Sequence, residues 1–135
     1  MAARKLHQLN ILCNATQLFE VAQLIGFCRI PTAYASVIIA RSEDYGANSR
    51  GTVRVARKIV DQLNSTTQLI FASIRSAAQL ALCVMNNPHA VTVPPMTWEK
   101  IYGHPTTRAE VERMLSAWSN KPMSPLTMTD AHPSR

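Results

Sequence analysis

The stretch that most constrains this fold is Phe71–Arg75, where an apolar run ends and a helical pattern begins. Residues 69–72, Leu-Ile-Phe-Ala, are typical of a parallel strand that is covered on both faces. The helical pattern starts at Ser76 and continues to about residue 85. We therefore predict a strand that passes almost directly into a helix, with Ser73 and Arg75 between them.

This junction has the residue types that bind phosphate. A helix N-terminus supplies free N–H groups and a partial positive charge, and Arg75 supplies a planar fork of N–H donors. The alternative is that Ser73 only caps the helix and Arg75 is solvated. The local pattern by itself favours this alternative, so the phosphate interpretation depends on what stands at the other strand ends.

The same order of strand and helix patterns occurs four times along the chain. The predicted strands lie at 10–13, 33–40, 68–72 and 90–93, and the predicted helices at 17–25, 49–63, 76–86 and 97–118, the last broken at 103–105. Such alternation predicts right-handed βαβ units, a parallel sheet and an α/β fold. The spacing does not distinguish half of an eightfold β/α barrel from a small open sheet. In either fold, the chemistry belongs at the C-terminal ends of the strands.

Composition and charge narrow the possible partners. A hydrophobic content of 47% with 16% charged residues indicates a globular domain rather than a disordered chain. The net charge of +6 comes from scattered residues, apart from four on one predicted helix that we interpret as a solvated face: Arg50, Arg54, Arg57 and Lys58. Aromatic residues are few and are not interleaved with the basic ones, so we expect no nucleic-acid partner.

The cysteines and histidines indicate neither a disulfide framework nor a metal site. Cys13, Cys28 and Cys83 are an odd number in apolar surroundings, which predicts reduced core thiols in a cytoplasmic protein. Cys83, His89 and His104 have a spacing that fits no compact metal site, so we expect no metal. No segment is long enough for a membrane span, and no signal sequence is evident, so no membrane is expected as a partner.

Four short motifs lie in order at the predicted strand ends. Residues 14–19 read Asn-Ala-Thr-Gln-Leu-Phe, residues 36–41 Ser-Val-Ile-Ile-Ala-Arg, residues 72–75 Ala-Ser-Ile-Arg, and residues 92–94 Thr-Val-Pro. The first three are similar to Asn-x-Thr-x-x-Phe, Ser-Pro-Phe-Val-Gly-Arg and Ala-Ser-Phe-Arg. In this order, over about residues 9–118, they resemble the C-terminal half of transaldolases, particularly the small transaldolase and fructose-6-phosphate aldolase-like group.

The resemblance implies a fold and a set of site residues. It implies strands 5–8 of a transaldolase-type (β/α)8 barrel, that is, a half-barrel over residues 1–119. Separately, the prolines, serines and threonines of residues 120–135 predict a disordered tail. Asn14 and Thr16 match residues that hold the substrate and the catalytic water, and Ser36 matches a residue of the substrate pocket. Arg41, Ser73 and Arg75 match the phosphate-binding group. The implied activity is dihydroxyacetone transfer or aldol cleavage in pentose phosphate metabolism, with no cofactor.

The resemblance also implies a missing part. The Schiff-base Lys of the family lies on the strand before the first one here, with its assisting Asp and Glu further upstream. None of Lys5, Lys58, Lys100 and Lys121 falls on a predicted strand. We therefore expect no catalytic residue in this chain, which would be a truncated or split transaldolase that is inactive alone. The alternatives are a non-catalytic sugar-phosphate-binding or regulatory module, and a remnant without function. Expected partners are a sugar phosphate and either a second copy or a complementary N-terminal half-barrel.

Overall fold

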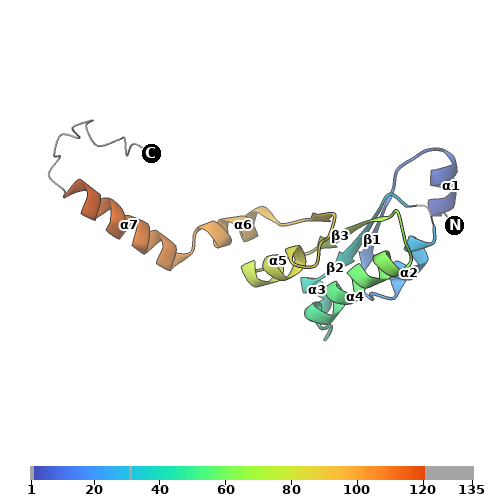
Figure 1. The fold of residues 1–135 in the computed structure, drawn as a ribbon, viewed down its shortest axis with the longest axis horizontal. Coiled ribbons are helices and arrows are strands. Elements are labelled where there is room, and N and C mark those ends of the chain that lie inside the picture. Colours follow the sequence, from blue (N-terminus) through green and yellow to red (C-terminus); the bar gives the residue numbers. More distant parts are fainter. Residues whose placement is uncertain (1, 31, 121–135) are drawn as a thin grey trace, which may run out of the picture. The chain divides into compact units, whose positions relative to one another are not determined.

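The computed structural model describes residues 2–30 and 32–120, which fall into two compact units divided between Tyr102 and Gly103. The first unit alternates strands and helices (Figure 1). Its strands are β1 (Asn14–Leu18), β2 (Tyr34–Ile38), β3 (Gln68–Ala72) and β4 (Ala90–Val91). Its helices are α1 (Ala2–Gln8), α2 (Gln23–Cys28), α3 (Ala40–Glu43), α4 (Ser49–Gln62), α5 (Ala77–Val84) and α6 (Pro95–Tyr102). The predicted tail from residue 121 onward lies outside the described residues.

The four strands form one parallel sheet in the order β1-β2-β3-β4. The register between β2 and β3 is regular and pairs Ile38, the last residue of β2, with Ala72, the last residue of β3. The prediction of a parallel sheet built from successive strand–helix units is confirmed. Four parallel strands with their helices are consistent with part of a β/α barrel.

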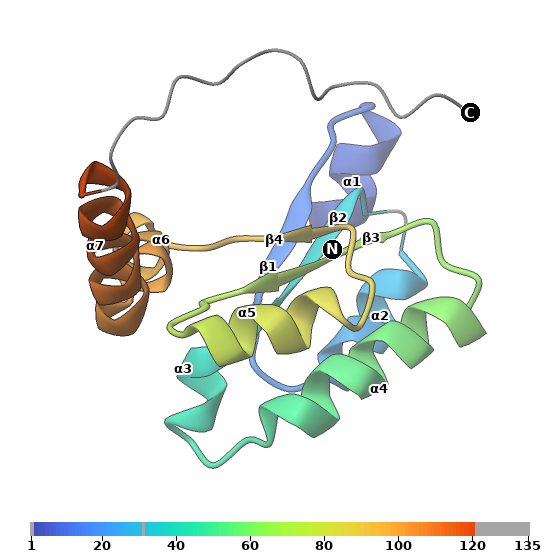
Figure 2. The ribbon, with the colours of Figure 1, turned by 60° about the vertical axis from the view of Figure 1, so that its left-hand side comes forward.

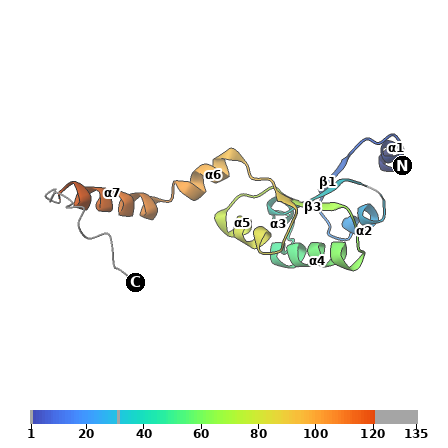
Figure 3. The ribbon, with the colours of Figure 1, turned by 45° about the horizontal axis from the view of Figure 1, so that its top comes forward.

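The core lies between the sheet and three helices. α2, α4 and α5 lie on the same side of the sheet (Figures 2 and 3). Alternate strand residues point toward them, including Val37, Leu69 and Phe71, each of which has no exposed surface. α4 contributes the apolar residues of one helical face, Val53, Ala56 and Val60. Burying these side chains is the main favourable contribution to the stability of the unit.

Two helices begin at side-chain caps. Asn48 precedes α4, and its side chain accepts the backbone N–H of Gly51 at 3.2 Å. Ser76 precedes α5 and accepts the N–H of Gln79 at 3.2 Å. Both caps satisfy N–H groups that have no partner within the helix. Because Ser76 is the cap, the alternative interpretation that Ser73 caps this helix is wrong.

The first predicted strand was placed too early. The apolar run at 10–13 is not a strand: Leu12 is 79% exposed, and Asn10 has a left-handed φ of 57°. The strand begins where Tyr34 donates its N–H to the Cys13 carbonyl and pairing with β2 starts. As a consequence, the first predicted helix, at 17–25, is replaced by the shorter and later α2.

The later elements fit the predictions more closely, with differences mainly at their ends. β3 has the predicted bounds, and α4 ends one residue early. β2 and β4 are shorter than predicted, and α3 has no counterpart among the predicted helices. Such short helices and strands contain few residues from which they could be predicted. The length of a strand is determined by its pairing with neighbouring strands rather than by the length of the apolar run.

The second unit contains α7 (Pro105–Ser119), which is preceded by His104 without a side-chain cap. Pro105 occupies the first turn, where its missing N–H costs nothing. Glu110 lies beyond that turn and pairs with Arg113. None of the helices in residues 2–30 and 32–120 has the length and apolar character needed to cross a membrane.

Candidate anion-binding site

The turn after β3 is held in one conformation by its own contacts. Ser73 adopts a left-handed φ of 65°, which is costly for a residue with a Cβ. Ile74 is fully buried, and its carbonyl accepts the Thr97 hydroxyl at 3.1 Å. The Arg75 N–H donates to Gln79 Oε1 at 2.8 Å. The backbone of Ser73, Ile74 and Arg75 is therefore fixed before any ligand arrives.

The end of β2 lies directly beside this turn. Ile39 donates its N–H to the Ala72 carbonyl at 2.9 Å, and Ala40 donates to the Ser73 carbonyl at 3.0 Å. α3 starts at Ala40, so Arg41 is the next residue after this contact. Two predicted phosphate donors, Arg41 and Ser73, thus belong to backbone segments that are hydrogen-bonded to each other.

Arg41 is oriented by β1. Its Nη2 donates to Gln17 Oε1 at 3.2 Å, and its guanidinium carbon lies 5.4 Å from the centre of the Phe19 ring. Gln17 has a left-handed φ of 63° at the point where the pairing of β1 with β2 is irregular. Such a bulge redirects a side chain relative to a regular strand. Here the side chain of Gln17 contacts Arg41.

Arg75 is paired with a carboxylate. Its Nη1 donates to both oxygens of Asp44, each at 2.9 Å. The two side chains are about half exposed, 52% for Arg75 and 51% for Asp44. Both carboxylate contacts use the same nitrogen, so they leave the Nε and Nη2 edge of the guanidinium unused by Asp44. That edge is the planar fork that binds two oxygens of a phosphate.

The predicted sugar-binding residues lie within strands rather than after them. Ser36, in the middle of β2, is buried and donates its hydroxyl to Asn14 Oδ1 at 2.9 Å. Asn14 is the first residue of β1, and Thr16 lies two residues further, exposed. Because side chains alternate along a strand, Ser36 points away from the helix-covered face that contains Val37. The structure therefore brings Asn14 and Ser36 together, on the face opposite to the helices.

The glutamate beside Asp44 has a different role. Glu43 accepts hydrogen bonds from the Ser49 hydroxyl and from Gln79 Nε2. It thereby connects α3 to the start of α4 and to α5. Asp44, Gln17 and Gln79 were missed as site residues by the sequence, since each acts on a partner far away along the chain. The only local signal in the sequence is the pair of adjacent carboxylates, Glu43 and Asp44, in a polar stretch.

The described side chains around the turn supply positive charge and fixed hydrogen-bond donors. Lys5, Lys58 and Lys100 all lie on helices, and among the described residues no lysine is on a strand. No group of three or more possible metal ligands occurs in residues 2–30 and 32–120. Arg41 and the turn at Ser73 thus stand on adjacent strand ends, and Arg75 follows two residues after Ser73.

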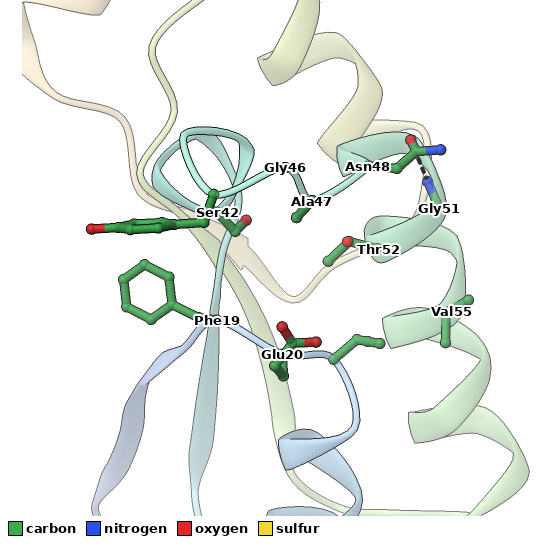
Figure 4. A pocket seen from close by; sticks show the side chains of 11 residues that line it. Phe19, Glu20, Ser42, Gly46, Ala47, Asn48, Gly51, Thr52 and Val55 are labelled. Carbon is green, nitrogen blue, oxygen red and sulfur yellow. Dashed lines mark hydrogen bonds between the residues drawn. The ribbon is translucent and has the colours of Figure 1, made fainter.

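A cavity of about 700 Å³ is bounded by the loop that follows β1, by α3 and by the first turns of α4 (Figure 4). It is lined by Phe19, Glu20, Thr52 and Val55, among others, and none of the six predicted site residues contributes to it. Its charged group is a carboxylate, which disfavours a bound phosphate. Size therefore does not identify the anion site in this protein.

The fold defines a class: a parallel α/β unit with polar and basic side chains at the C-terminal ends of adjacent strands, which is where β/α barrels carry their active sites. The model of the transaldolase/fructose-6-phosphate aldolase family matches residues 1–131. The chain belongs to the transaldolase/fructose-6-phosphate aldolase family.

Similar proteins include three described as probable transaldolases. That of Caulobacter vibrioides is 30% identical over 82% of this chain and 51% of its own length. That of Oceanobacillus iheyensis is 27% identical over 89% of this chain and 56% of its own. That of Streptococcus agalactiae is 29% identical over 88% and 55%. The chain thus spans about half the length of these curated relatives.

Proposed function

We propose that this chain supplies the phosphate-binding half of a transaldolase-type barrel, corresponding to strands 5–8, and binds the phosphate group of a sugar phosphate. Arg41, Ser73 and Arg75 are the proposed phosphate ligands. The observation that carries the proposal is the pair of backbone hydrogen bonds from Ile39 and Ala40 to Ala72 and Ser73, which places the Arg41 segment beside the Ser73 turn. Two guanidinium groups and a hydroxyl then serve one anion.

The left-handed conformation of Ser73 supports this role. Strain of about 1–2 kcal/mol in a non-glycine residue persists where the surrounding structure requires it, and such residues cluster at binding sites. Arg75 keeps its two-donor edge available despite the contact with Asp44. The capped start of α5 adds partial positive charge close to the same turn.

The sugar is assigned to the adjacent strand face. We propose that Asn14, Thr16 and Ser36 contact its hydroxyl groups. The hydrogen bond between Ser36 and Asn14 supports the pairing, because it fixes an amide and a hydroxyl on the same face of neighbouring strands. The phosphate and the sugar would then extend from the strand ends toward the interior of a complete barrel, in carbohydrate metabolism of the pentose phosphate type.

We propose that no lysine of this chain forms a Schiff base with the sugar. A Schiff-base Lys must be uncharged, which requires burial or a neighbouring cation that lowers its pKa. Lys58 and Lys100 are exposed on helices. We therefore propose binding without turnover by this chain alone. The three free cysteines fit a reducing compartment such as the cytoplasm.

A partner is proposed for the uncovered part of the sheet. β1 and β4 are its edges, and Ile70 lies partly exposed on the face opposite to the helices. Unpaired parallel edges and an apolar face favour association. We propose either a second copy or a complementary N-terminal half-barrel. Sedimentation at rising concentration should show self-association, and a stable, cooperatively folded monomer at all concentrations would exclude the second copy.

The phosphate site is tested by titration. Calorimetry with inorganic phosphate should show binding by the wild-type chain and at least about a tenfold loss in Arg75→Ala, since a charge-assisted hydrogen bond contributes about 1.5–3 kcal/mol. Arg113→Ala is the matched control, because Arg113 is likewise exposed and paired with a carboxylate, but on α7. Equal affinities of wild type and Arg75→Ala would show that the assignment is wrong.

A further inference from the structure

Resting on this proposed function, we infer that Asp44 is an internal counter-anion that limits the affinity of the Arg75 site and discriminates against ligands of high negative charge. The evidence is the geometry of one contact. Asp44 approaches a single nitrogen of Arg75, with both oxygens at 2.9 Å from Nη1. A bound phosphate takes the opposite, two-donor edge of the same guanidinium.

Because Asp44 and a phosphate use different edges of Arg75, Asp44 stays next to the bound ligand and does not compete with it for the same N–H donors. The carboxylate and the phosphate bind the same cation from two sides, so the carboxylate repels the ligand whenever the ligand is bound. Within the described residues, the side chain of Asp44 is hydrogen-bonded only to Arg75. By contrast, the adjacent Glu43 is engaged by Ser49 and Gln79, which makes Glu43 a structural connection.

The size of the repulsion follows from charge and distance. For a dianion about 7 Å from the carboxylate, Coulomb's law with the screening of physiological salt gives a weakening of about threefold to tenfold. For a monoanion at the same place the factor is about the square root of this, or roughly twofold to threefold. Asp44 thus reduces the preference of the site for a dianion over a monoanion.

The alternative role for Asp44 is to hold Arg75 in its binding orientation. An exposed ion pair contributes little, typically less than about 1 kcal/mol, because water competes and two side chains must be ordered. The backbone of Arg75 is already fixed by Gln79, and the preceding residue is buried. The charge of Asp44 therefore outweighs its orienting effect.

The test is Asp44→Asn, which removes the charge and keeps the shape. Titration with sulfate should show affinity increased about threefold to tenfold, and titration with formate an increase of about twofold to threefold. Glu110→Gln is the matched control, because it changes the net charge equally and removes the partner of Arg113 on α7. This control should change either affinity by less than about 1.5-fold.

The outcomes separate this inference from the proposed function. If the wild type binds and Arg75→Ala does not, but Asp44→Asn binds sulfate equally or more weakly, the counter-anion role is wrong and Asp44 positions Arg75. If Arg75→Ala binds like the wild type, the phosphate assignment fails and this inference with it. If neither the wild type nor Asp44→Asn binds sulfate at low millimolar concentration, both the phosphate assignment and the counter-anion role are contradicted. Asp44 is half exposed, and circular dichroism will show that the variant is folded.

Discussion

Raising the pH should destabilise this protein through one buried thiol. Cys83 lies on α5, has no exposed surface, and packs in the core. Burial, and secondarily the charge of Glu43, raises the pKa of the Cys83 thiol from its ordinary value of 9.0 to about 11. In the unfolded chain the thiol ionises near pH 9, whereas in the folded protein it stays neutral until about pH 11. The contribution is thus fully present below pH 9 and is lost as the pH rises toward 11.

The magnitude follows from the difference in pKa. Each unit corresponds to 1.36 kcal/mol, so the two units between 9.0 and about 11 give at most about 2.7 kcal/mol. Urea unfolding at pH 8 and pH 11, under reducing conditions, measures the free energy of unfolding. Because lysines and tyrosines also titrate in this range, the comparison is with Cys83→Ala. The advantage of the wild type over this variant should shrink by about 2 kcal/mol across the range. A constant difference between the two proteins would refute the buried, neutral thiol.

Three further predictions concern the fold, the turn and the chemistry. Thr67→Val should lower the free energy of unfolding by about 1–2 kcal/mol, because the buried hydroxyl of Thr67 is hydrogen-bonded to the carbonyls of Phe27 and Thr32. The control Thr66→Val, at the neighbouring exposed position, should have little effect. Equal effects of the two substitutions in urea unfolding would contradict this prediction. Ser73→Gly should be about 0.5–1 kcal/mol more stable than Ser73→Ala, since only Gly relieves the left-handed conformation, and equal melting temperatures would argue against strain there. Borohydride treatment with fructose 6-phosphate should give no lysine adduct by mass spectrometry, and an adduct on one lysine, lost on its replacement by Arg, would show that this chain contains Schiff-base chemistry.

The sequence predicted those elements whose stability is local or strongly periodic. β3 consists of Gln68 followed by an uninterrupted apolar run and has the predicted bounds, and α4 has a long apolar face behind a polar cap. β1 was misplaced because an apolar run resembles a strand whether or not a partner strand is available. The pairing that starts at Tyr34 determined where the strand begins.

The surroundings of the candidate site could be predicted only in part. The resemblance pointed to Arg41, Ser73 and Arg75, and the structure shows their segments joined by backbone hydrogen bonds. It did not indicate the contact between Asp44 and Arg75, because residues 31 positions apart meet only through the packing of two strand ends. Nor did it indicate the strained conformation of Gln17, which depends on the irregular pairing of β1 with β2.

The most direct test of the central claim is residue-resolved binding of phosphate. In a ¹⁵N NMR titration with inorganic phosphate, the largest saturating shifts should occur at the backbone amides of Ser73 and Arg75 and at the side-chain Nε of Arg41. Phosphate attracted merely by the net positive charge would instead shift the exposed basic residues Arg50, Arg54 and Lys58 on α4, without saturation. Saturable shifts confined to residues 41 and 73–75 are the result that this account predicts, and shifts confined to α4 would contradict it.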